Sequence, residues 1–254
     1  MKFIKYFLIL AIVPVLGFGP PQGKKKVAVT TFYVNKYIGT EGLGSGASMV
    51  AAISTLADDP NFNLQPILDK FHKTFFTEYA KSFPFDLLPE EEVTGNEDYK
   101  AYESRFGETS DADRSKMAQR YLVIDGYKPL IEGALIKKEN RNQTKMIEIF
   151  DANADGVMFV NMDYSFITKG GVGPLAAVGI KAFVRIKLWN KESKKVFAIN
   201  ESAVSKATVG MVGGIPVMDT DKLLPMCQDA SDRLLEDLKK RLPKIAARSA
   251  KKFQ

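Results

Sequence analysis

The chain has 254 residues but only one cysteine, Cys227, and one histidine, His72. A single cysteine excludes an internal disulfide, which many exported domains use as a stabilising link. A catalytic triad would need His72 as its base, and the sequence contains no G-x-S-x-G motif to supply a nucleophile. Both residues fall on or beside apolar stripes of expected helices, so we expect both to have packing roles. A metal-ligating His72 and a reactive Cys227 thiol are the alternatives.

Long hydrophobic runs are also scarce. The apolar run at residues 6–16 is shorter than the roughly 20 residues that a membrane-spanning helix needs. It follows Lys2 and Lys5 and precedes small residues, the order that is typical of a secretory signal. We therefore expect residues 1–19 to be a signal peptide and the protein to be periplasmic or otherwise exported. No cysteine lies near the expected cleavage position, so we expect no lipoprotein anchor.

Charge is distributed unevenly along the chain. The formal net charge is +6, or +4 without Lys2 and Lys5, and acidic residues dominate residues 90–113. The carboxyl-terminal tail is basic and contains no acidic residue, which suits the negative pole of its own helix or an anionic membrane surface. Nucleic acid is not expected as a partner of an exported protein. The cations of this tail are Lys239, Lys240, Arg241, Lys244, Arg248, Lys251 and Lys252.

The middle of the chain alternates apolar and polar residues with a period of two, which predicts strands. Residues 155–168 are apolar on both faces at their start and on one face at their end. This strand is therefore expected to enter a covered core and leave it toward solvent. Residues 179–189 and 196–205 follow, joined by a polar turn at 190–194. We predict an antiparallel meander over about residues 155–205, with helices packed against it.

Helical periodicity is clearest at residues 64–83, where apolar residues recur every three or four positions. Residues 90–92 are interpreted as a solvated acidic run, and Pro243 is expected to interrupt the last helix. We predict one α/β domain over residues 24–254, with a mixed sheet, flanking amphipathic helices and a basic C-terminal helical tail. Further strands are predicted at 26–34 and 85–88, further helices at 49–56, 98–106, 111–120, 143–150 and from 219 or 220 onward, and a brief strand or helix end at 121–127.

Three glycine-rich loops are the candidate contact surfaces. Residues 39–47 resemble the dinucleotide loop G-x-G-x-x-G/A, but residues 35–38 separate them from the strand at 26–34, so a flexible surface loop fits better. The loops at 170–179 and 210–214 are apolar and lack phosphate-loop spacing, which fits long turns or a surface that meets a partner or a membrane. The candidate residues are Gly42, Gly44, Gly46, Gly171, Gly173, Gly210, Gly213 and Gly214.

No catalytic, cofactor-binding or metal-ligating residue is assigned. Asp155 and Asp163 are close in sequence, but both belong to one extended strand. At about 3.3 Å per residue they lie roughly 26 Å apart, too far to share a metal ion.

The order of segments resembles a family of envelope proteins. The quoted segments are the strand "KVAVTTFYV", the segment "FDLLPEEEV", the strand entry "ANADGVMFVNMDYSF" and the hairpin "KAFVRIKLWNKESKKVFAINESA". The family includes the curli-secretion channel lipoprotein, the amino-terminal domain of the Tol-system propeller protein and the lipoprotein activators of penicillin-binding proteins. This chain lacks the lipobox cysteine of many members, and residues 90–142 have no clear counterpart in the family.

The resemblance implies a three-layer domain that works by contact and not by catalysis. In the channel member, apolar hairpins form a pore within a ring, whereas the activator docks on an enzyme. Residues 170–179 lack the 9–11 residues of alternating pattern that a bilayer-spanning strand needs, so docking on an envelope protein is favoured. The alternatives are a membrane-inserted oligomeric secretion-channel subunit and a small-ligand or nucleotide binder using residues 39–47. A homo-oligomer remains open, because amphipathic helices bury their stripes equally well within or between chains.

Overall fold

Six strands form one mixed sheet, and the three-stranded meander that the sequence predicts is part of it. The computed structural model describes residues 24–40, 43, 46–107, 111–133, 136–172, 175–250 and 253. β1 runs parallel to its neighbours β2 and β4, whereas β4, β5 and β6 pair antiparallel in succession, and the short β3 pairs antiparallel with β1. The strand order is β2 (Asp86–Leu87), β1 (Lys26–Gly39), β4 (Gly156–Gly170), β5 (Ala177–Asn190) and β6 (Lys195–Val204), with β3 at Tyr121–Val123.

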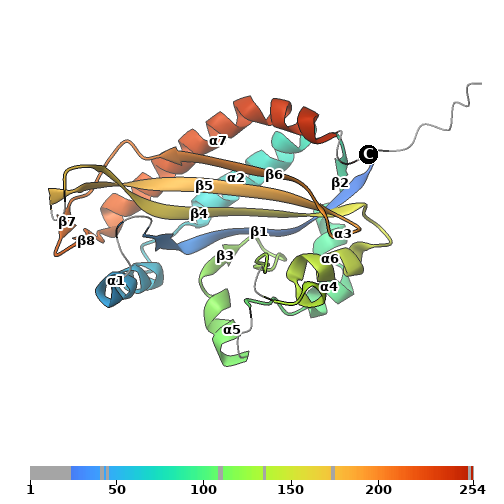
Figure 1. Ribbon diagram of the computed structural model, residues 1–254, viewed down its shortest axis with the longest axis horizontal. Helices are drawn as coiled ribbons and strands as arrows, with labels where there is room; N and C mark the ends of the chain where they lie inside the picture. Colours follow the sequence, from blue (N-terminus) through green and yellow to red (C-terminus); the bar gives the residue numbers. More distant parts are fainter. Residues whose placement is uncertain are drawn as a thin grey trace, which may run out of the picture.

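Helices cover both faces of this sheet, which confirms the mixed α/β class (Figure 1). One face packs against α2 (Gln65–Thr77) and the long α7 (Thr220–Ala250), and the other against α3, α4 and α6. The remaining elements are α1 (Ala47–Asp58), α3 (Glu90–Thr94), α4 (Glu97–Ala101), α5 (Asp111–Ala118), α6 (Asn142–Phe150), the 3-10 helices η1 (Tyr79–Ser82) and η2 (Lys138–Asn140), and the two-stranded hairpin of β7 (Met211–Val212) and β8 (Ile215–Pro216).

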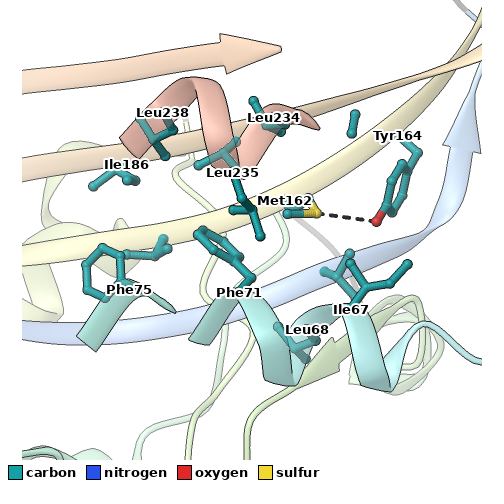
Figure 2. Close-up of a cluster of buried hydrophobic side chains, with 14 of the residues drawn as sticks. Ile67, Leu68, Phe71, Phe75, Met162, Tyr164, Ile186, Leu234, Leu235 and Leu238 are labelled. Carbon is teal, nitrogen blue, oxygen red and sulfur yellow. Dashed lines mark hydrogen bonds between the residues drawn. The ribbon is translucent and has the colours of Figure 1, made fainter. Parts of the chain in front are cut away.

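The larger core lies between the sheet, α2 and α7 (Figure 2). Phe71 of α2 is fully buried, as is Leu234 of α7. Tyr164 of β4 brings a hydroxyl into this core, where its Oη lies 2.7 Å from Ser231 Oγ of α7 and 3.3 Å from Met162 Sδ. The apolar stripes of both helices therefore face the same side of the sheet, and the buried hydroxyl has hydrogen-bond partners.

A second, smaller core covers the opposite face near the start of β1. Here the β1–β4 register shifts at Thr30, which leaves that residue without a partner in the ladder. Tyr99 of α4 donates its hydroxyl to the Thr30 carbonyl over 2.9 Å and accepts from the Lys128 amide over 2.9 Å. Thr31 Oγ1 also donates to the Lys128 carbonyl. The bulge in β1 thus holds the loop around Lys128 against the sheet.

Several predicted helix boundaries are wrong. The helix predicted at 64–83 ends at Thr77 and continues as the 3-10 helix η1. The helix predicted at 98–106 ends at Ala101, within α4. α7 continues past Pro243 to Ala250, because the burial of Leu242 and Ala246 on the sheet outweighs the roughly 3 kcal/mol that an interior proline costs.

The first strand also differs from its predicted length. β1 continues from Lys26 to Gly39, beyond the predicted end at residue 34, because a second shift in its pairing with β4 lets the ladder resume at Ile38. Polar residues around Asn35 interrupt the alternation that the sequence prediction used, which explains the missed extension.

Candidate functional site

The three glycine-rich loops that the sequence singles out belong to one end of the molecule. The bridge between Val178 and Val209 joins the start of β5 to the segment that leads into β7. α1 follows the first glycine-rich loop and contacts β8, and Thr220 at the start of α7 donates to Asp59 at the end of α1 over 2.6 Å. Figure 1 shows β7, β8 and the β4–β5 connection at the left end, with α1 below them.

This end of the molecule is free of charge along its chain segments. Residues 42–57, 170–180 and 207–218 contain no Asp, Glu, Lys or Arg, although 26% of the whole chain is charged. We call the described part of these segments the apolar end. All exposed large hydrophobic side chains among the described residues belong to it, namely Val50 (53% exposed), Val172 (86%), Leu175 (86%) and Val212 (71%).

Glycine shapes the turns that present these side chains. Gly213 and Gly214 both have positive φ, 60° and 81°, which is the two-residue turn expected between tightly paired strands such as β7 and β8. Gly171 has φ 77°, and a Cβ there would collide with the carbonyl of Leu175. These glycines therefore fix the backbone of the turns, and the contact surface itself is supplied by the valine and leucine side chains between them.

The other predicted glycines differ in what the structure says of them. Gly46 is the exposed N-cap residue of α1, with φ −61° and no side-chain cap. Gly210 is exposed, and its carbonyl accepts from the Val217 amide. Gly42, Gly44 and Gly173 lie outside the described residues. Val50 was not singled out from the sequence, and the convergence of the three loops was not predicted; the uncharged runs were the available signal.

Charged groups form a rim around the apolar end. Asp59 lies there at the end of α1, and the Thr220 hydroxyl that donates to it lowers its pKa. Asp219 and Asp221 flank Thr220 at the start of α7. On the other side, Lys169 Nζ donates to the carbonyls of Ser205 and Lys206, each over 2.9 Å. The rim thus carries several carboxylates, and one of its lysines is tied to the backbone.

One of the arguments against a dinucleotide-binding loop at residues 39–47 is wrong. Residues 35–38 do not separate the first strand from the glycine-rich loop, because β1 continues through them to Gly39. The glycines Gly42 and Gly44 that would approach a phosphate lie outside the described residues, so the structure gives no cradle to compare with that motif.

His72 packs in the core, as predicted. Its ring lies 5.1 Å from the Phe32 ring and 4.9 Å from the Phe76 ring, centroid to centroid. His72 Nε2 is also 2.6 Å from Glu90 Oε1, and Tyr127 donates its hydroxyl to the same oxygen over 3.0 Å. The interpretation of residues 90–92 as a solvated run is therefore wrong for Glu90, which lies at the start of α3 and connects it to α2 and to the segment after β3.

Cys227 is fully buried on α7, as predicted for a small core residue, and burial raises the pKa of its thiol. A raised pKa reduces the thiolate fraction, and the thiolate is the species that reacts. We expect Cys227 to be unreactive toward a maleimide under native conditions and to react fully in denaturant. Labelling in a urea titration should follow unfolding; rapid labelling of the folded chain would contradict the burial.

A polar cluster occupies the sheet face away from α7. Asp163 of β4 lies 3.1 Å from Arg185 of β5 and accepts from the side-chain amides of Asn35 and Asn161. Desolvation by burial nevertheless raises its pKa. With three partners, this carboxylate is satisfied within the sheet. Among the residues that the structure describes, no group of three or more His, Cys, Asp or Glu side chains is arranged to hold a metal ion.

Within the described ranges, no helix combines the length and the hydrophobicity needed to cross a membrane. No protein-family model matches the chain, and no curated protein matches it in sequence.

Proposed function

We propose that this chain is an exported, non-enzymatic accessory protein of the cell envelope that acts by protein–protein contact through its apolar end. The observation that carries the proposal is the gathering of Val50, Val172, Leu175 and Val212 in three uncharged segments. The signal-like order of residues 1–19 supports export. The resemblance of the segment order to the envelope family named above supports a place in the cell envelope.

The exposed side chains of the apolar end are the expected energetic centre of the contact. Removing a valine or leucine side chain from water contributes about 1.5–3 kcal/mol, so a partner that covers Val172, Leu175 and Val212 gains several kcal/mol from them alone. Isolated exposed apolar residues are common, but a cluster without interspersed charge is typical of an interaction surface.

A protein partner suits this end better than a lipid surface. The rim of the apolar end is of mixed charge: it carries Asp59 and Asp221, and Asp219 pairs with Lys222 at 3.2 Å. It therefore offers anionic headgroups no excess of positive charge. The first described residue, Lys24, is at the opposite end of β1, beyond Lys26. The chain therefore enters the described part of the structure at the end away from the apolar end.

The secretion-channel alternative has less support. The connection between Gly170 at the end of β4 and Ala177 at the start of β5 is shorter than the 9–11 residues of one bilayer-spanning strand. The β7–β8 hairpin has two residues in each strand. Both are tips that fit a shallow groove on a partner, and neither has the length of a pore-forming hairpin.

The proposal is tested by placing charge on the apolar end. The double variant Leu175→Asp and Val212→Asp is expected to reduce crosslinked partner recovered from an envelope extract by about tenfold or more, because a buried unpaired carboxylate is costly. Its melting temperature should stay close to that of the parent chain, since both side chains are exposed. The extract would be treated with a photoactivated crosslinker and the adducts quantified by mass spectrometry.

A matched control adds the same charge elsewhere. Asn200 and Ser202 are exposed on β6, outside the three segments of the apolar end, and Asn200→Asp with Ser202→Asp should leave recovery unchanged. Equal recovery from the parent and from the apolar-end variant would refute contact through this surface. Equal loss from both double variants would show that net charge alone sets the recovery.

A further inference from the structure

The end of the molecule opposite the apolar end gathers lysines from three segments that are far apart in the sequence. Sheet register brings two of them together: Val27 pairs with Gly156, and Gly156 pairs with Asn190, the last residue before the β5–β6 turn. The carboxyl end of α7 reaches the same end, at the right in Figure 1. We call these lysines the basic end: Lys24, Lys25, Lys26, Lys191, Lys194, Lys195 and Lys244.

Phe253, near the end of the chain, packs beside the basic end. Phe253 is buried, its ring lies 5.5 Å from the Phe85 ring, and Lys25 Nζ lies 5.1 Å above it. A Cβ at Gly156 would come within 3.3 Å of the Phe253 ring, so Phe253 sits directly beside the start of β4. The start of the domain and Phe253 near its end are thus neighbours.

The positive charge at the basic end is only partly compensated. Lys24 pairs with Asp86 at 3.4 Å, and Lys191 pairs with Asp151 at 3.3 Å. Asp155 accepts from the Lys26 amide over 2.8 Å, and Glu192 is a further carboxylate in the β5–β6 turn. Within the described ranges, Lys194, Lys195 and Lys244 form no ion pair, and all three are exposed.

A group of acidic residues lies on the other face of the sheet. α3 and α4 begin with Glu90, Glu91 and Glu92 and with Glu97 and Asp98, and they pack on the face opposite α7. The molecule is therefore dipolar near this end, basic along the β5–β6 turn and the end of α7, and acidic around α3 and α4.

We propose that the basic end rests on anionic lipid headgroups. Charge complementarity favours this partner, because clustered exposed lysines are attracted to the negative surface of anionic membranes. Lys194, Lys195 and Lys244 are exposed and form no ion pair within the described ranges, so their charges are available to the headgroups.

This placement deepens the proposed function and, in one respect, rests on it. With the basic end on lipid, the apolar end points away from the membrane, toward a partner within the exported compartment (Figure 1). The lipid contact itself needs no partner protein, so a vesicle assay with purified chain tests it separately from the docking proposal.

The test measures partition of the mature chain, from residue 20 on, onto vesicles of phosphatidylcholine with and without phosphatidylserine. The triple variant Lys191→Gln, Lys194→Gln and Lys195→Gln should lose roughly fivefold per lysine, on the order of a hundredfold in total, on phosphatidylserine vesicles. Partition onto pure phosphatidylcholine should not change, because this headgroup carries no net charge. Salt should abolish the difference between the two vesicle types.

A matched triple variant controls for net charge. Lys73, Lys116 and Lys222 are exposed and lie in α2, in α5 and at the start of α7, away from the basic end. Converting all three to glutamine should change partition by about twofold at most, because distant charges are screened. Two results would overturn the proposal: an equal loss in both triple variants, or no gain from phosphatidylserine in the parent chain. The variant Leu175→Asp and Val212→Asp should bind these vesicles like the parent, which separates a failure of docking from a failure of lipid contact.

Discussion

Replacing Phe71 with alanine is expected to lower the free energy of unfolding by about 3–5 kcal/mol. Phe71 is fully buried on α2, and its ring centroid lies 4.7 Å from that of Phe32 and 6.4 Å from that of Phe75. Truncation removes the transfer free energy of the ring and leaves a cavity that the strand and the helix cannot close, because both are fixed by the sheet and by α7 (Figure 2).

The measurement is urea unfolding followed by circular dichroism, with the free energy extrapolated to water. Lys73→Ala is the matched control, since Lys73 is exposed on the same helix and its removal should stay within about 0.5 kcal/mol. If Phe71→Ala were as mild as Lys73→Ala, the packing of α2 on the sheet would be wrong.

The second large effect concerns the bulge in β1. Tyr99→Phe removes one hydroxyl that serves both the Thr30 carbonyl and the Lys128 amide. An unsatisfied buried polar group costs about 1–3 kcal/mol, so leaving both without this partner should destabilise the fold by about 2–4 kcal/mol. The loss arises from hydrogen bonding alone, because phenylalanine keeps the ring that packs on Phe150.

Tyr37→Phe is the control for Tyr99→Phe. The Tyr37 hydroxyl has one partner, Ser54 Oγ at 3.0 Å, at a partly buried position, so its removal should cost about 1 kcal/mol or less. Amide hydrogen exchange adds a local test, since the amides around Lys128 should lose protection in Tyr99→Phe and keep it in Tyr37→Phe. Unchanged protection in both variants would contradict the role assigned to Tyr99.

The meander could be predicted from the sequence because one buried face imposes a period of two over long strands. β4, β5 and β6 follow the predicted limits to within a few residues. The ends of the helices were harder to predict from the sequence. α7 tolerates Pro243 because neighbouring residues of the helix are buried against the sheet. This tertiary stabilisation cannot be read from the local sequence pattern.

The candidate site was predictable in its parts but not as a whole. The glycine-rich loops were visible in the sequence, yet their meeting depends on the bridge between Val178 and Val209 and on the contact of α1 with β8. Glu90 shows the same limit, since its bonds to His72 and Tyr127 join residues that only the tertiary fold brings together. Long-range proximity is set by register and packing, and neither can be read from local periodicity.

The central claim is that the apolar end meets a protein, and site-specific photocrosslinking tests it most directly. A photoreactive amino acid would be placed at Val212, on the apolar end, and in a second chain at Ser202, on the exposed face of β6. The account predicts a protein adduct from position 212 that is absent from position 202 and disappears when Leu175→Asp is added. Equal adducts from both positions, or lipid adducts alone from position 212, would contradict it.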